Sequence, residues 1–180
     1  MTKHINDLES EKFEEYSDYA VRTIETEHAR VHEGVAFLSG HYIAAVAAGG
    51  TLILSIDPGN AMHTIFSIAA GGDVTFEFFR NPTFTPGTVL PIFNKNDLSA
   101  KVSSAVITHS PTGISGGDAF PIGFVPGGSG GNAQGGASDF HREWILSPAS
   151  VYIVRLTNVT TQPIQISAFV DWYEPGAVAP

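Results

Sequence analysis

The chain has 180 residues, a formal net charge of −9 and no cysteine. This length suits one domain with a substantial core; the absence of cysteine excludes disulfides and thiolate metal sites, and an acidic chain without a Lys/Arg stripe argues against nucleic-acid binding. Charged residues make up only 15% of the chain, against roughly 25% in typical soluble domains, so we expect other copies or a partner to cover part of the surface.

Residues 1–32 differ from the rest of the chain and predict an N-terminal arm that is partly helical. Acidic residues are concentrated here, and apolar residues recur at spacings of three to five, an imperfect helical stripe. So narrow an apolar face does not stabilise an isolated helix. The helix either packs against its own domain or reaches a neighbouring subunit or another protein. In the second case the candidate partner-binding residues are Phe13, Tyr16, Ala20 and Ile24.

The first residues carry no apolar stretch of the kind found in signal peptides. The longest weakly polar run, residues 42–56, is interrupted by Gly49 and Gly50, so we expect no membrane span. Both observations favour synthesis in the cytoplasm.

Residues 33–174 predict an all-β domain, followed by a short C-terminal tail at 175–180. Short apolar or alternating runs, separated by Gly, Pro, Asn and Asp turn signals, are typical of strands. The expected strands cover residues 35–38, 42–46, 51–56, 64–68, 74–79, 88–93, 105–109, 119–125 and 143–146. With no intervening helix, this pattern predicts a two-sheet antiparallel β-sandwich, and the long connections favour a jelly roll.

The last strands, within residues 150–174, predict a long β-hairpin. In the second arm, alternate residues from Ile164 to Trp172 are apolar, and among the residues between them only Phe169 departs from the polar pattern. In the first arm, Tyr152, Val154 and Leu156 share one face. Residues 158–162 form the expected loop.

Candidate catalytic and metal motifs are weak. Gly-x-Ser-x-Gly occurs at 113–117 and 127–131, but neither serine precedes a helical pattern, which the nucleophile elbow requires. The best metal candidate, Asp139, His141 and Glu143 on one strand face, also fits a solvated strand entrance. No His-x-His pair and no phosphate loop is present. We therefore expect a non-enzymatic protein with no catalytic residue, no metal site and no cofactor.

Several short pieces of the sequence point to one family. They are His32-Glu33-Gly34 with Phe37, Gly87-Thr88 leading to Asn94-Lys95-Asn96, the stretch from Glu143 to Pro148 with Tyr152 and Asn158, and the closing Trp172-Tyr173-Glu174. In these pieces, across about residues 32 to 174, the chain resembles the jelly-roll head decoration (capsid cement) proteins of tailed bacteriophages. The chain departs from that pattern at Asp97, where we expect a basic residue.

The resemblance implies a homotrimeric structural protein of the virion, made in the host cytoplasm and bound to the outer capsid surface. Its partners would be its own copies and the major capsid protein, whose capsomers it would staple together, with the N-terminal arm facing the capsid. The alternative is a phage tail or fibre-attachment module with carbohydrate or protein binding. Surface glycans would then be the ligands, and Tyr42 and Tyr173 the candidate stacking residues.

Overall fold

The computed structural model describes residues 28–127 and 143–175. The proposed partner-binding residues Phe13, Tyr16, Ala20 and Ile24 lie outside these residues, as does most of the predicted arm. Asp139 and His141, of the candidate metal cluster, also lie outside them.

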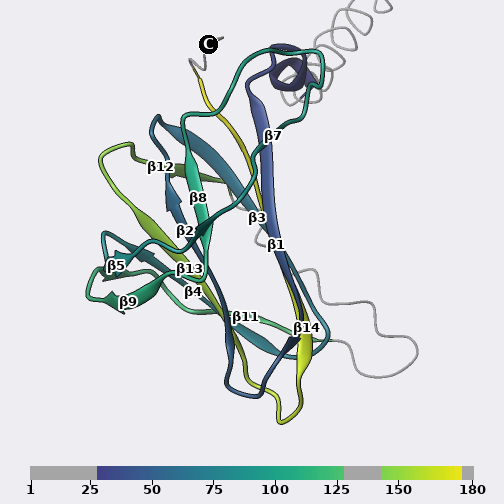
Figure 1. The fold of residues 1–180 in the computed structure, drawn as a ribbon, viewed down its shortest axis with the longest axis vertical. Helices are drawn as coiled ribbons and strands as arrows, with labels where there is room; N and C mark the ends of the chain where they lie inside the picture. The colour runs from purple at the N-terminus through teal and green to yellow at the C-terminus, as the bar shows by residue number, and fades with distance from the viewer. Residues whose placement is uncertain (1–27, 128–142, 176–180) are drawn as a thin grey trace, which may run out of the picture.

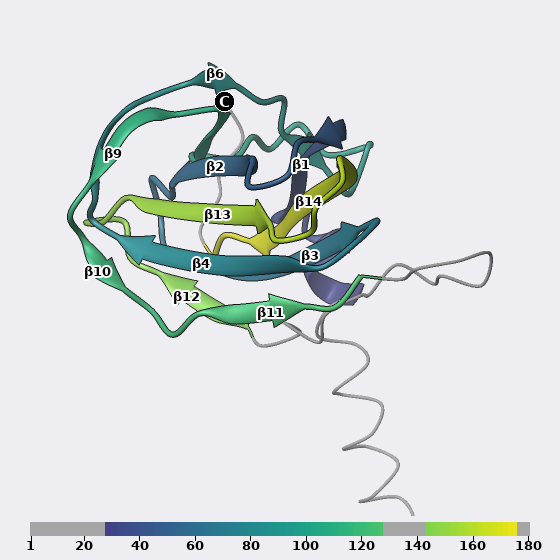
Figure 2. The same cartoon turned by 90° about the horizontal axis from the view of Figure 1, so that it is seen from below.

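The described residues form two antiparallel sheets packed face to face, as Figures 1 and 2 show, so the all-β sandwich is confirmed. The first sheet has the order β12 (Trp144–Leu146), β3 (Met62–Ala70), β14 (Ile164–Tyr173), β1 (Ala36–Val46) and β7 (Phe93–Asn94). The second has the order β10 (Asp118–Ala119), β4 (Val74–Arg80), β13 (Tyr152–Asn158), β2 (Thr51–Asp57), β8 (Val106–His109) and β6 (Thr88–Val89), with β11 (Gly123–Val125) also on β4. A small separate pair joins β5 (Thr83–Thr85) to β9 (Thr112–Ser115).

The strand pairing is nested, which identifies the sandwich as a jelly roll. β1 pairs with β14, β2 with β13, β3 with β12 and β4 with β11. Successive members of this series lie in opposite sheets, so the connections between them cross from one sheet to the other. This is the arrangement of a long hairpin rolled up into two layers.

The predicted hairpin between the last two strands is wrong. β13 pairs with β2 and β4 in the second sheet, whereas β14 pairs with β1 and β3 in the first. The predicted alternation is confirmed in the second arm, where Val170 and Trp172 are buried; in the first arm Tyr152, Val154 and Leu156 are buried as expected, but so is Ile153 on the opposite face. An apolar row on each strand can be buried in the core whether the two strands are neighbours in one sheet or lie in opposite sheets. The alternation therefore does not distinguish these two arrangements.

Other strand boundaries differ for local reasons. The strands expected at 35–38 and 42–46 form the single strand β1. The run expected at 88–93 divides into β6 and β7, which belong to different sheets, and Pro91 lies between them. The run expected at 119–125 divides into β10 and β11 around Pro121. A proline contributes no N–H to a ladder, so both runs are interrupted where one occurs.

A helical turn at 28–32 precedes β1 and lies at the upper end of the sandwich in Figure 1. Backbone bonds from Glu33 N to Ala29 O (2.8 Å) and from Gly34 N to Val31 O (2.9 Å) complete it. Gly34 has a φ of 69°, the left-handed conformation that commonly ends a helix. The side chains of Asn94 and Asn96 donate to the carbonyl oxygens of Gly34 (2.8 Å) and His32 (3.2 Å), and so fix the turn to the sandwich.

Candidate interaction face

The outer surface of the first sheet carries a patch without charged residues, which we call the uncharged face. It consists of outward positions on three neighbouring strands: Gly40 and Tyr42 on β1; Ser67 and Ala69 on β3; and Gln165, Ser167 and Phe169 on β14. Leu38 and Ile65 border it, on either side of Asp171 in the adjacent cross-strand row. Register places Gly40, Phe169 and Ser67 in one cross-strand row and Tyr42, Ser167 and Ala69 in the next. A solvent-facing sheet surface is ordinarily polar, and among these residues Phe169 is the large apolar side chain that departs from that rule.

The central feature of the uncharged face is Phe169, which lies over Gly40. A Cβ atom added at Gly40 would lie 2.5 Å from Phe169 Cδ1 and 2.9 Å from Cε1, so only glycine leaves room for the ring. Even so, Phe169 remains 46% exposed and the neighbouring Tyr42 56% exposed. The face therefore presents aromatic surface that the described fold does not cover.

Two further exposed apolar side chains lie on the edge strands, near the upper end of the uncharged face. Phe93 of β7 pairs with Leu38 and is 62% exposed, and Ile145 of β12 pairs with His63 and is 68% exposed. At the lower end Tyr42, Ala69, Gln165 and Ser167 line a shallow hollow, in which the Tyr42 hydroxyl donates to Gln165 Oε1 at 3.3 Å. Exposed aromatic and aliphatic side chains therefore lie beside uncharged polar ones on this side of the sheet.

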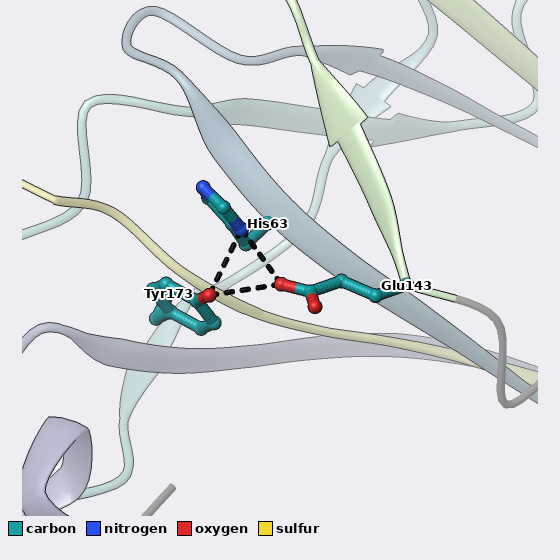
Figure 3. Close-up of polar contacts among 3 residues, drawn as sticks. All are labelled: His63, Glu143 and Tyr173. Atoms are coloured by element: carbon teal, nitrogen blue, oxygen red, sulfur yellow. Dashed lines mark hydrogen bonds and ion pairs between the residues drawn. The ribbon is translucent and has the colours of Figure 1, made fainter. Parts of the chain in front are cut away.

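Polar groups mark the upper end of the uncharged face. Lys95 Nζ contacts both carboxylate oxygens of Asp171, at 2.9 and 2.8 Å. Beyond this ion pair, Figure 3 shows His63, Glu143 and Tyr173 converging from β3, from the residue before β12 and from β14. Glu143 Oε1 lies 2.6 Å from His63 Nδ1 and 2.9 Å from the Tyr173 hydroxyl, and the rings of His63 and Tyr173 stack at 4.5 Å.

The electrostatics of this cluster keep Glu143 ionised. Burial alone would raise the pKa of Glu143, but hydrogen bonds from Tyr173 and His63, together with the charge of His63, outweigh it, so the pKa lies below its ordinary value. A carboxylate with a lowered pKa stabilises the fold above its ordinary range and loses that contribution as the pH falls through the lowered value. The cluster contains no serine, threonine or cysteine nucleophile, and its contacts join β12 to the sheet.

The motifs considered for catalysis do not assemble into a site within the described residues. Ser115 ends β9, and the chain continues through Gly116 and Gly117 into β10 rather than into a helix. Most of the second Gly-x-Ser-x-Gly stretch lies outside the described ranges. Residues 28–127 and 143–175 contain no group of three or more His, Asp or Glu side chains able to hold a metal ion, and none of their helices is long and apolar enough to cross a membrane.

Two residues of the sequence pieces that suggested decoration proteins, Asn158 and Glu174, hold loops in place. Asn158 is fully buried; its Nδ2 donates to the carbonyl oxygens of Val46, Ala47 and Gln162 at 2.8–3.1 Å. Glu174 is equally buried and accepts hydrogen bonds from the Ser103 hydroxyl, from the Ser104 amide and hydroxyl at 3.1 and 2.8 Å, and from Trp172 Nε1 at 3.0 Å. Both residues therefore fix the architecture of the sandwich.

The structure also places the candidate sugar-stacking residues. Tyr42 and Tyr173 both lie on the outer surface of the first sheet, but Tyr42 borders the lower hollow and Tyr173 belongs to the upper polar cluster. Sequence reasoning missed the uncharged face as a unit. The signal was present, since the outward positions of residues 38–42, 65–69 and 165–169 lack charge, but only strand order shows that they are neighbours.

No protein-family model and no curated protein matches this sequence.

Proposed function

We propose that this chain is a capsid decoration (cement) protein of a tailed bacteriophage, a non-enzymatic virion component that binds the outer surface of the head as a homotrimer and staples capsomers. The uncharged face carries the proposal. Interfaces between copies of a chain are depleted in charged residues and enriched in aromatic ones at their centre. Phe169, Tyr42 and Phe93 supply that composition on an otherwise acidic protein.

In this proposal the uncharged face joins the three copies, and the arm before the sandwich contacts the major capsid protein. The face lies on paired strands of the sheet, so its backbone loses little conformational entropy when the copies associate. The arm residues Phe13, Tyr16, Ala20 and Ile24 are the proposed capsid contacts. Three arms on one trimer would bind with avidity, so a modest single contact would give lasting attachment.

The experiment that tests the proposal places one charge at the centre of the uncharged face. Phe169→Glu would bury an unpaired carboxylate in the trimer, so we expect the dissociation constant of the trimer to rise at least about tenfold, with the sandwich still folded. The matched control is Thr51→Glu, an exposed position on β2 in the second sheet, which should stay trimeric. Light scattering reads the oligomer, and cosedimentation with undecorated particles reads capsid binding.

Two results would contradict the proposal. If the wild-type protein is monomeric at micromolar concentration, the proposed trimer is wrong. If the trimer of Phe169→Glu is as stable as that of the wild type, the uncharged face is not its interface. Loss of capsid binding on deletion of residues 1–31, with the trimer intact, would support the role of the arm.

The alternative function, a tail or fibre-attachment module that binds carbohydrate, has one observation in its favour. The lower hollow combines the exposed ring of Tyr42 with the polar side chains of Gln165 and Ser167, and sugars are bound by an aromatic ring beside hydrogen-bonding groups. Glycan binding by intact particles, lost in Tyr42→Ala, would favour this alternative.

A further inference from the structure

His28 and His32 form a pair on the helical turn that joins the arm to the sandwich. They are four residues apart, and in an α-helix this spacing places two side chains on the same face. Their Nε2 atoms lie 2.9 Å apart, with the rings edge to face at a centroid distance of 4.4 Å. Both side chains are exposed. Two imidazole nitrogens thus meet in open solvent.

We propose that His28 and His32 bind a divalent first-row transition-metal ion, with Cu²⁺ and Ni²⁺ preferred over Zn²⁺. Imidazole is a good ligand for all three ions. With metal–nitrogen bonds of about 2.0–2.1 Å, two nitrogens 2.9 Å apart subtend about 90° at the ion. That is the angle between adjacent ligands in the square-planar or tetragonal sites that Cu²⁺ and Ni²⁺ favour, whereas a tetrahedral Zn²⁺ site needs about 3.3 Å.

Metal binding by the two histidines requires only that one proton moves within an imidazole ring. The separation of 2.9 Å also suits an N–H···N hydrogen bond, in which one ring carries its proton on Nε2 and the other accepts it. For both nitrogens to donate lone pairs to a metal, the first ring moves that proton to Nδ1. The ion then takes the place of the shared proton, and water completes its coordination shell.

The surroundings of the turn favour a preformed site. Asn96 Nδ2 donates to the carbonyl oxygen of His32, and the turn closes through the Glu33 and Gly34 amides. The one cationic side chain between the two histidines, Arg30, is paired with Glu33 at 2.8 Å and lies over the Tyr173 ring at 5.5 Å. Its charge is therefore offset close to the site, and the protein as a whole carries a net charge of −9.

A bound ion would stabilise the helical form of the turn, because only that form brings residues 28 and 32 together. Anything that binds one conformation selectively increases its population. The ion would thus hold residues 28–32 in the helical conformation, directly before the sandwich. This inference concerns the isolated protein and does not depend on the capsid.

The test is titration of the full-length protein with Ni²⁺ and Cu²⁺ by calorimetry, with Mg²⁺ as the hard-cation control. We expect one transition-metal site per chain, and a loss of affinity of at least about tenfold in His28→Ala and in His32→Ala. The matched variant is Ala29→His with His32→Ala, which keeps the composition but places the histidines at adjacent positions that do not face each other. It should bind as weakly as His32→Ala.

Histidine side-chain NMR signals provide the second readout. Addition of Cu²⁺ should first broaden the signals of His28 and His32, before those of His63 and His109. Equal affinity in the rearranged variant, or binding that persists when both His28 and His32 are replaced, would overturn the proposal. Unchanged melting temperatures of the variants without metal verify that the sandwich is intact.

Discussion

Phe169 and Gly40 show how one contact between residues determines the surface of the sheet. The ring occupies the space that a side chain at position 40 would need, and it does so on the outside of the sandwich. Gly40 does not have a left-handed φ, so the glycine is required by the space that the Phe169 ring occupies and not by its backbone conformation. An aromatic ring over a strand glycine also shields a backbone that would otherwise be open to water.

Gly40→Ala should displace the Phe169 ring and destabilise the sandwich by about 1–3 kcal/mol, the usual cost of forcing an extra methyl into a packed position. In a Phe169→Ala background the same change should cost much less, because the clashing ring is gone. Urea denaturation of the four proteins in this cycle gives the coupling energy. Equal costs in both backgrounds would show that the ring does not lie over Gly40.

The sequence alone predicts which residues are buried in a regular strand, but not every buried residue. The alternation in 164–172 predicts which side chains are buried, and the structure confirms it for Ile166, Ala168, Val170 and Trp172. The burial of Glu174 could not be read in the same way. Its hydrogen-bonding partners Ser103 and Ser104 are 70 residues away in the chain, and nothing local marks a carboxylate for the interior.

At the scale of the element, β1 and β8 meet through a stacked histidine pair. The rings of His41 and His109 are 4.0 Å apart and inclined by 16°. These strands belong to different sheets, so the pair bridges the two layers. Partial burial lowers the pKa of His41, and the charge of His109 lowers it further.

The lowered pKa predicts a loss of stability in mild acid. The unfolded chain takes up a proton at His41 near pH 6.5, whereas the folded chain resists it, so the free energy of unfolding falls as the pH drops through about 6.5. His41→Phe keeps a stacking ring without the titration. Its free energy of unfolding should therefore change less than that of the wild type between pH 7.5 and 5.5. Denaturant unfolding at both pH values measures this, and equal changes in the two proteins would contradict it.

Element order was harder to predict than element existence. Residues 74–80 and 51–57 form strands close to the predicted bounds, since their apolar patterns are local. The hairpin prediction failed because β13 and β14, although consecutive in sequence, pair with other strands: β13 with β2 and β4, and β14 with β1 and β3. In a jelly roll most pairings join strands far apart in the chain, and local patterns carry no information about such partners.

At the scale of the whole molecule, the proposed trimer makes unfolding depend on concentration. Association stabilises only the folded chain, so the melting temperature should rise with protein concentration. Phe169→Glu should show a lower melting temperature than the wild type at each concentration, because less of its folded form is trimeric. Scanning calorimetry over a hundredfold concentration range measures both proteins. A wild-type melting temperature that is independent of concentration would contradict a trimer that dissociates on unfolding.

The pairing of the first strand with the last also determines how the molecule responds to a pulling force. β1 begins and β14 ends at the same end of the sandwich, where Ala36 is opposite Tyr173. A force that separates these two ends opens the ladder one pair of hydrogen bonds at a time, like a zipper. A force between the helical turn and the loop before Ile164, at the far end, loads the same ladder in shear, so that many bonds resist together. A sandwich held at the helical turn and pulled at the loop before Ile164 is therefore loaded in its mechanically strong direction.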